Sequence, residues 1–329
     1  MSNLPSITEH PIPPDNMPWY QKTIEQIGAF VGKDKLVCAK GTHTLNRTLD
    51  AMYGLAEFPK FRHILVTESG QAESKLLGIV SLRDINRNWE SMVSGKEKTM
   101  QDVMTPFHAS PDRFRWVSSN ENIQLAINYL FEPLQLVQRS IYVSALPILA
   151  SSSQLAIGIM SYTDVIDAMI KGRISPPDMT MREIMQPLLD ETDRYHVFID
   201  DEFFDVAALI KNSLYRTIPV VNNDQDRQLQ GLITDNKVFI TRMRAGDKID
   251  TMKASDLNIM YTEGSDYKGK LLFETVTPEQ KIQDILPKFK TLIRPDALPV
   301  VQNSRSTRLV GMVSYIDIFC ALSKRKSQG

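Results

Sequence analysis

One short pattern recurs four times along this 329-residue chain, and it constrains the fold more than any other feature. A glycine is followed three residues later by serine or threonine and, in three of the four copies, three residues later again by aspartate. The glycines are Gly78, Gly158, Gly231 and Gly311, separated by 80, 73 and 80 positions. A fixed period of this kind indicates a duplicated supersecondary unit that buries its apolar face against its neighbours. We therefore expect four related units.

Three further signals support the division into four units. A short apolar strand precedes each glycine pattern, and it contains a central proline in all copies but the first; the strands are 62–66, 145–149, 217–221 and 297–301. Apolar residues at helical spacing lie upstream, as at Ile282, Ile285 and Phe289. The related segments 99–104 and 180–185 mark the starts of the second and third units. Each unit is predicted to read helix, strand, strand, helix.

Together these elements resemble the cystathionine-β-synthase (CBS) domain family over roughly residues 33–324. In that family two repeats pair into a Bateman module, and two modules can stack into a disc. The resemblance implies an α/β (α+β) fold of four CBS repeats in two modules. This architecture is similar to that of the gamma subunit of AMP-activated protein kinase and of stand-alone prokaryotic tandem CBS proteins.

The domain boundary is predicted at Ser175–Asp178, where two adjacent prolines interrupt helix and strand bonding. Residues 1–32 are expected to form a tail with a helix over 19–31. The first module then covers residues 33–174, as repeat 1 (33–95) and repeat 2 (96–174). The second covers residues 178–324, as repeat 3 (178–248) and repeat 4 (249–324). Residues 325–329 form a second tail.

The resemblance implies that an adenine nucleotide (AMP, ADP or ATP) binds in the clefts between paired repeats. The aspartate of each glycine pattern would accept hydrogen bonds from the ribose, with the serine or threonine close to ribose or phosphate. In this chain these residues are Ser81, Asp84, Ser161, Asp164, Thr234, Ser314 and Asp317. Lys237 replaces the aspartate in repeat 3, so that site is expected to lack its ribose anchor. The alternative is that Ser-x-x-Asp only caps the following helix.

Basic residues lie at or just before the starts of the apolar strands, where they could bind phosphate; they are Arg62, His63, Arg216 and Arg294. The alternative is that they are solvated surface residues. Three extended segments, 105–117, 188–199 and 261–276, mix aromatic and basic side chains that could stack on adenine or could pack as surface loops. These side chains are Phe107, His108, Arg113, Arg115, Trp116, Arg194, Tyr195, His196, Tyr261, Tyr267 and Lys268.

Composition argues against several other functions. The chain has 38 basic and 39 acidic residues, so no overall positive field favours nucleic acid. Its two cysteines lack metal-ligand spacing and fit a reducing compartment. No secretory signal is seen, so a cytoplasmic protein is expected. Residues 141–160 approach the length of a membrane span but contain a polar centre, which predicts two strands and a hairpin instead.

No sequence motif of a hydrolase, metalloprotease or nucleotide triphosphatase is present, so no enzyme activity is expected. The working hypothesis is a non-catalytic regulatory protein that senses an adenine nucleotide and signals to a partner protein. Neither a metal nor a cofactor beyond the regulatory nucleotide is expected, the partner is not specified, and a homodimer is left open. The alternative is a scaffolding or regulatory subunit whose nucleotide sites are vestigial.

Overall fold

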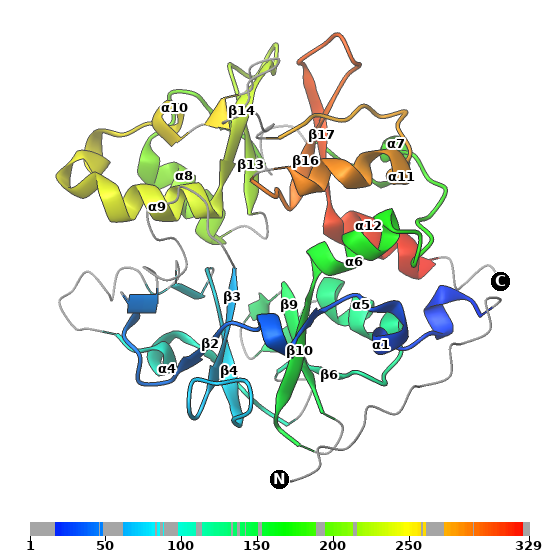
Figure 1. Ribbon diagram of the computed structural model, residues 1–329. Helices are drawn as coiled ribbons and strands as arrows, with labels where there is room; N and C mark the ends of the chain where they lie inside the picture. The colour runs from blue at the N-terminus through cyan, green and yellow to red at the C-terminus, as the bar shows by residue number, and fades with distance from the viewer. Residues whose placement is uncertain are drawn as a thin grey trace, which may run out of the picture.

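The computed structural model describes residues 17–45, 47–48, 62–82, 84–85, 88, 98–109, 114–132, 134–136, 139–141, 143–150, 153–188, 195–212, 216–257, 259–260, 273–291 and 293–324. Figure 1 shows four units of similar build around a common centre, with repeats 1 and 2 in one half and repeats 3 and 4 in the other. The expected α/β (α+β) fold is confirmed.

An antiparallel hairpin forms the middle of each repeat. The hairpins are β3 (His63–Thr67) with β4 (Leu76–Ser81), β9 (Ala145–Leu149) with β10 (Ala156–Ser161), β13 (Thr217–Val221) with β14 (Leu229–Thr234), and β16 (Ala297–Val301) with β17 (Leu309–Ser314). The first strands are almost wholly buried, which explains their continuous apolar sequence. In every hairpin, the first residue of the first strand lies opposite the serine or threonine that ends the second.

Helices flank the hairpins in the predicted order. The helices before the hairpins are α5 (Ile123–Phe131), α8 (Phe203–Asn212) and α11 (Ile282–Ile285). The last of these continues into the 3-10 helix η4 (Leu286–Lys290). The helices after the hairpins are α6 (Tyr162–Ile170), α9 (Asp235–Ala245) and α12 (Tyr315–Lys324). Asn122 caps α5 by accepting a hydrogen bond from the Gln124 amide at 2.7 Å. The order helix, strand, strand, helix is thus confirmed in repeats 2 to 4. In repeat 1, the flanking helices lie largely outside the described residues.

A leading segment precedes each repeat and consists of a one-turn helix followed by a two-residue strand. These segments contain α1 (Ile24–Ile27) and β1 (Val31–Gly32), α4 (Met100–Val103) and β5 (Thr105–Pro106), α7 (Met181–Ile184) and β11 (Gln186–Pro187), and α10 (Ala254–Leu257) and β15 (Ile259–Met260). A capping box begins α1, α4 and α7. The helix predicted over 19–31 is shorter than expected, because Gly28 at φ 63° ends α1 in the left-handed conformation. The 3-10 helices η1 (Trp19–Gln21) and η2 (Lys33–Lys35) flank this segment.

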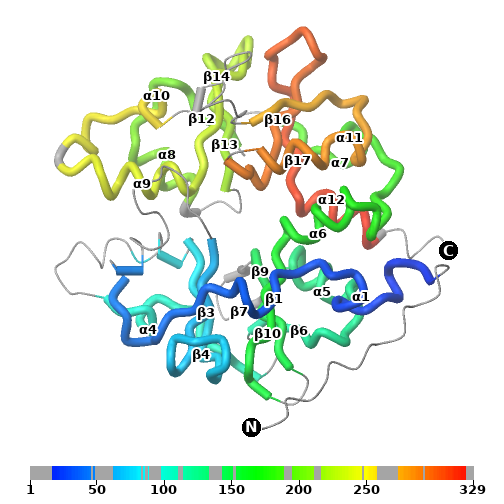
Figure 2. The backbone as a smooth tube through the Cα atoms, viewed as in Figure 1, coloured from blue at the N-terminus to red at the C-terminus, as the bar shows by residue number. Residues whose placement is uncertain are grey.

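The leading segments are exchanged between paired repeats. The strand before repeat 1, β1, joins the sheet of repeat 2 in the order β1-β10-β9-β6, where β6 is Val117–Ser118. Conversely, β5 from the start of repeat 2 completes the repeat 1 sheet, β2-β3-β4-β5, where β2 is Cys38–Lys40. Figure 2 follows the N-terminal segment across the hairpin of repeat 2.

The second module repeats this reciprocal exchange. The repeat 3 sheet is β12-β13-β14-β15, where β12 is Val197–Phe198 and β15 comes from the start of repeat 4. The repeat 4 sheet is β11-β17-β16, where β11 comes from the start of repeat 3. Two repeats are therefore the smallest unit in which these sheets are complete.

Apolar clusters connect the repeats in two directions. Leu65, Leu76, Ala145 and Leu149 lie in one cluster between the sheets of repeats 1 and 2, and a second cluster links the sheets of repeats 3 and 4 in the same way. Across the modules, one cluster unites helices of repeats 2 and 4, and another brings Phe239 of α9 against repeat 1. Apolar cores therefore join the two repeats of each module, and other apolar cores join repeat 2 to repeat 4 and repeat 1 to repeat 3 across the modules.

The apolar stretch at residues 141–160 forms the β9–β10 hairpin, as predicted. A separate small hairpin of β7 (Leu134–Leu136) and β8 (Arg139–Ile141) precedes it. Among the helices that the structure describes, none combines the length and the apolar character that a membrane crossing needs. The domain boundaries themselves remain a prediction; the proposed linker at Ser175–Asp178 lies between α6 and α7.

Candidate functional site

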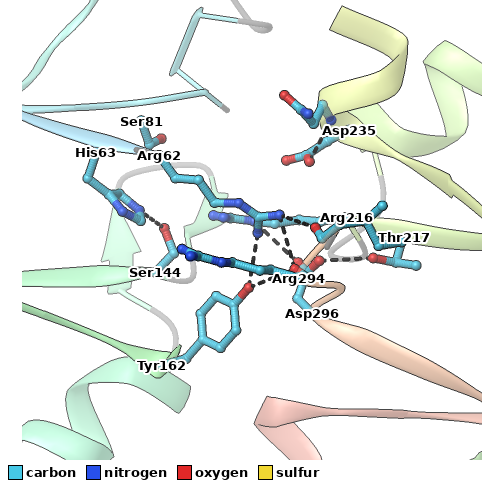
Figure 3. A network of polar contacts seen from close by, with 12 residues as sticks. Arg62, His63, Ser81, Ser144, Tyr162, Arg216, Thr217, Asp235, Arg294 and Asp296 are labelled. Atoms are coloured by element: carbon cyan, nitrogen blue, oxygen red, sulfur yellow. Dashed lines mark hydrogen bonds and ion pairs between the residues drawn. The ribbon is translucent and has the colours of Figure 1, made fainter. Parts of the chain in front are cut away.

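Four structurally equivalent residues define the centre of the molecule. Each immediately precedes the first strand of a hairpin: Arg62, Ser144, Arg216 and Asp296. The pairing register places each of them beside the residue that starts the helix after the hairpin: Leu82, Tyr162, Asp235 and Tyr315. Figure 3 shows the polar members of these two sets other than Tyr315, with His63 and Thr217, converging from all four repeats. We call this group the central cluster.

Arg62 connects three repeats within the central cluster. Its Nη1 donates to the Tyr162 hydroxyl of repeat 2 at 3.0 Å. Its Nη2 donates to two backbone carbonyls of repeat 4, those of Ile293 at 2.9 Å and Arg294 at 3.0 Å. Arg62 is therefore a half-buried contact between the modules, and its guanidinium is directed inward rather than to solvent.

Arg216 and Asp296 form an ion pair between repeats 3 and 4. The Nε atom of Arg216 lies 3.8 Å from Oδ2 of Asp296, and their side chains are only 10% and 8% exposed. Thr217 donates from Oγ1 to the other carboxylate oxygen of Asp296 at 2.9 Å. Burying both charges is tolerated because each is compensated by the other and by hydrogen bonds.

The charges of the central cluster balance. Arg62 and Arg216 contribute two positive charges, and Asp235 and Asp296 two negative charges when both are ionised. Burial raises the pKa of Asp235 and raises the pKa of Tyr162 to about 12. The arginines of the centre are thus engaged by an internal ion pair and by hydrogen bonds between repeats, and they are not exposed.

His63 contributes to the central cluster as a neutral group. Burial, with the positive charges of Arg216 and Arg62, lowers the pKa of His63 to about 3. Its Nε2 lies 2.6 Å from the Ser144 hydroxyl of repeat 2. A neutral imidazole can hydrogen-bond a ligand oxygen but adds no charge toward phosphate.

Arg294 differs from the other predicted phosphate-binding residues. Its side chain is exposed, whereas its backbone carbonyl accepts hydrogen bonds from Arg62 and, at 3.4 Å, from the Tyr162 hydroxyl. The residue has φ of 45°, a left-handed conformation uncommon for a non-glycine residue. The position equivalent to Arg62 and Arg216 is occupied in repeat 4 by Asp296.

The Ser-x-x-Asp turns form capping boxes in repeats 1, 2 and 4. In each, one carboxylate oxygen accepts from both the amide and the hydroxyl of the serine at 2.6–2.8 Å; the pairs are Ser81 with Asp84, Ser161 with Asp164, and Ser314 with Asp317. In repeat 3, the Thr234 hydroxyl accepts from the amide of Lys237 at 3.1 Å. Capping therefore uses one oxygen of each aspartate and leaves the second oxygen for another role.

The exchanged strands decide what contacts that second oxygen. Thr105 of β5 donates to Oδ1 of Asp84 at 3.4 Å, and Gln186 of β11 donates to Oδ1 of Asp317 at 2.9 Å. In repeat 2 the corresponding position in β1 is Val31, whose side chain has no donor. No other side chain among the described residues outside the turn donates to Oδ1 of Asp164.

Asp164 is consequently the aspartate most open to an additional donor. Burial also raises the pKa of Asp164, although the hydrogen bonds from Ser161 oppose this effect. A carboxylate that keeps one oxygen unbound in a partly buried position suits a hydroxyl donor, such as those of ribose.

Several described side chains of the aromatic-basic segments pack against the protein, whereas His108 is exposed. Phe107 meets Phe114 edge to face, with centroids 5.4 Å apart, and Trp116 joins the same cluster between repeats 1 and 2. The His196 side chain is 4% exposed and lies 3.3 Å from Asp224. Arg113, Arg194, Tyr261, Tyr267 and Lys268 lie outside the described residues.

Sequence reasoning missed several members of the central cluster, namely Ser144, Tyr162, Thr217, Asp235, Asp296 and Tyr315. A position-by-position alignment of the four repeats contains the necessary signal, because it places Asp296 and Ser144 with the two arginines. Within the described ranges, no group of three or more His, Cys, Asp or Glu side chains could hold a metal ion.

Comparisons with known proteins agree with this architecture. A family model described as the CBS domain matches residues 181–240 and 273–324, which lie in repeats 3 and 4. A crystal structure from Methanocaldococcus jannaschii, described as a proposed archaeal homologue of g-AMPK, covers 91% of this chain and 99% of its own, with a TM-score of 0.67 and 18% identity. An uncharacterized conserved protein from Pyrococcus horikoshii covers 79% and 91%, with a TM-score of 0.50 and 15% identity. No curated protein matches the chain in sequence.

The matched regions are CBS domains, and the structure shows the same unit in repeats 1 and 2. The chain therefore has the CBS-domain fold in four repeats. Its architecture is similar to that of the archaeal structure described as a g-AMPK homologue, and at 18% identity this likeness concerns the fold alone.

Proposed function

We propose that this protein is a non-catalytic regulator that binds an adenine nucleotide between paired CBS repeats. The observation that supports this most is the second oxygen of Asp164, which faces no competing side-chain donor from the exchanged strand. In the family that the chain resembles, this aspartate accepts hydrogen bonds from ribose. The bound nucleotide is AMP, ADP or ATP.

Regulation follows from the position of Asp164 at the start of α6. This helix begins with Tyr162, which contacts both Arg62 of repeat 1 and the backbone of Arg294 in repeat 4. A ligand that holds the turn Ser161–Asp164 therefore acts on a helix that is part of the contact between the modules. A ligand shifts the arrangement of the modules to the extent that it binds one arrangement more tightly. A partner protein would detect that shift.

A nucleotide panel tests this function directly. Thermal unfolding and calorimetry with AMP, ADP, ATP and adenosine should show saturable stabilisation, by about 2.7 kcal/mol at 100 times the dissociation constant. Asp164→Ala should remove the response. Lys237→Ala is the matched control, because its repeat lacks the carboxylate. Incubation with the same nucleotides should show no turnover that follows protein concentration.

The second candidate function is a scaffold with vestigial sites. It is favoured by the central cluster, in which Arg62 and Arg216 already have internal partners. Wild-type protein that is folded but shows neither heat nor stabilisation with any nucleotide of the panel would support this second function over the first.

A further inference from the structure

A four-residue segment of repeat 4, residues 293–296, supplies acceptors to both arginines of the central cluster. The carbonyls of Ile293 and Arg294 accept from Arg62. The carboxylate of Asp296 lies 3.8 Å from Arg216. The two arginines come from repeats 1 and 3, so this one segment faces cations from both modules (Figure 3).

Asp296 is held in place independently of the arginine. Thr217 donates to its Oδ1 at 2.9 Å, and its backbone carbonyl accepts from the Tyr315 amide at 3.1 Å. Its carboxylate therefore occupies a fixed position beside Arg216, with 8% of the side chain exposed. A guanidinium at this depth would otherwise be a strong receptor for a phosphate group, because it donates parallel bonds to paired oxygens.

We propose that Asp296 is an internal substitute for a ligand phosphate, which closes the central cluster to phosphate until the carboxylate leaves Arg216. The segment 293–296 is then an autoinhibitory contact. This inference rests on the proposed function and deepens it, because it states which ligands the centre excludes. A nucleotide held at Asp164 gains no affinity from additional phosphates as long as Asp296 remains paired with Arg216.

The proposal rests on the pairing of a carboxylate with a receptor cation, so neutralising the carboxylate should open the receptor. Asp296→Asn retains the size of the side chain and its acceptor for Thr217, while it removes the carboxylate that is paired with Arg216 and leaves Asp235 as the remaining acid of the central cluster. The probe is inorganic pyrophosphate, which carries phosphate oxygens without adenine. Binding is measured by calorimetry and by thermal unfolding at constant ionic strength.

Asp296→Asn should bind pyrophosphate at least about tenfold more tightly than the wild type. The double variant Asp296→Asn/Arg216→Gln should lose this gain, because the receptor is removed with its inhibitor. Asp200→Asn is the matched control: it makes the same chemical change at a side chain that is 81% exposed, and it should behave as the wild type.

Thr217→Val provides a second, milder variant in case Asp296→Asn fails to fold. It removes the hydroxyl that holds Asp296, so it should raise pyrophosphate affinity in the same direction by a smaller factor. Folded Asp296→Asn with wild-type affinity overturns the proposal; if that variant does not fold, an unchanged Thr217→Val overturns it instead.

The two proposals fail separately. Nucleotide binding by the wild type without a gain in Asp296→Asn would reject the autoinhibitory contact and retain nucleotide sensing. A gain in pyrophosphate affinity with no nucleotide binding by the wild type would retain the autoinhibitory contact and reject nucleotide sensing.

Discussion

Tyr162 and Tyr315 stack face to face between repeats 2 and 4, with ring centroids 4.2 Å apart and planes inclined by 12°. Each residue immediately follows the second strand of its hairpin, so the two rings occupy equivalent positions in the two modules. Both are buried, and Tyr162 also accepts a hydrogen bond from Arg62. The stack thus joins the apolar core between the modules to the central cluster.

Removing the hydroxyl of Tyr162 should destabilise the protein while preserving the stack. Tyr162→Phe leaves Arg62 with one acceptor fewer, which should lower the free energy of unfolding by about 1.5–3 kcal/mol, since the donor is charged. Tyr162→Ala also loses the ring and should cost about 3–5 kcal/mol. Urea unfolding measures both. Tyr20→Phe, at a 37% exposed residue, is the control and should change little; equal stabilities of all three variants would contradict the contact.

The three capping aspartates should differ in nucleotide affinity. Asp164→Asn should weaken binding by about 10- to 150-fold, because it removes a charged acceptor. Asp84→Asn and Asp317→Asn should have smaller effects, since Thr105 and Gln186 already contact the second oxygen. Calorimetry measures the affinities, and thermal unfolding corrects for the similar loss of capping in all three. Equal loss in all three variants would show that the exchanged strand does not select the site.

Stability should fall below neutral pH partly through His63. The pKa of this group is about 3 in the folded protein, so between pH 6.5 and 3 the unfolded chain takes up a proton that the folded protein does not. Its contribution is complete above pH 6.5 and decreases by up to about 1.4 kcal/mol per pH unit below it. Urea unfolding at pH 7.5, 6.0 and 5.0 should give a shallower dependence for His63→Asn than for the wild type. Identical slopes would refute this assignment.

The pairing of the exchanged strand β11 with β17 requires a glycine at position 311 of β17. A Cβ at Gly311 would lie 2.6 Å from the backbone carbonyl oxygen of Gln186 in β11, so Gly311→Ala forces the strands apart. Such overpacking should cost about 1–3 kcal/mol in chemical unfolding. At Gly32 of β1, nothing lies within 4 Å of an added Cβ, and Gly32→Ala should be nearly neutral. The reverse order of these two effects would argue against the β11–β17 pairing.

The halves 1–174 and 178–329 should each fold and should reassociate. Each half contains a complete reciprocal exchange of leading segments. The cluster of repeats 2 and 4 draws residues from both halves, so separation exposes apolar helix faces that drive recombination. Circular dichroism of each half and size-exclusion chromatography of the mixture measure these outcomes. Unfolded halves that remain unfolded on mixing would reject the predicted boundary.

The sequence predicted the local structure of each repeat better than the contacts between repeats. The buried strands and the turns after Gly78, Gly158, Gly231 and Gly311 follow from apolar runs and from Ser-x-x-Asp capping, which depend on neighbouring residues. The leading helix α1 was expected as part of a longer helix over 19–31, and its likeness to residues 99–104 was not recognised, because the two share little beyond the capping pattern.

The partners of the arginines lay beyond sequence reasoning for a different reason. Arg62 and Arg216 were predicted to meet phosphate, but their observed acceptors come from repeats 2 and 4, far away in sequence. Arg294 was selected by its nearness to the strand, whereas the pairing register assigns the equivalent position to Asp296. Which oxygen of each aspartate stays available depends on the exchanged strands, which no local pattern reveals.

The exchange of leading segments also sets an order of events during synthesis. When the hairpin β3–β4 leaves the ribosome, its edge strand β4 is unpaired until Thr105 and Pro106 emerge. The hairpin β9–β10, by contrast, finds β1 already made. The same alternation recurs in the second module, where β14 waits for β15 and β17 receives the earlier β11. An unpaired edge is prone to pairing with other chains, so the nascent chain is most exposed to misassembly while the first repeat of each pair awaits the start of the second.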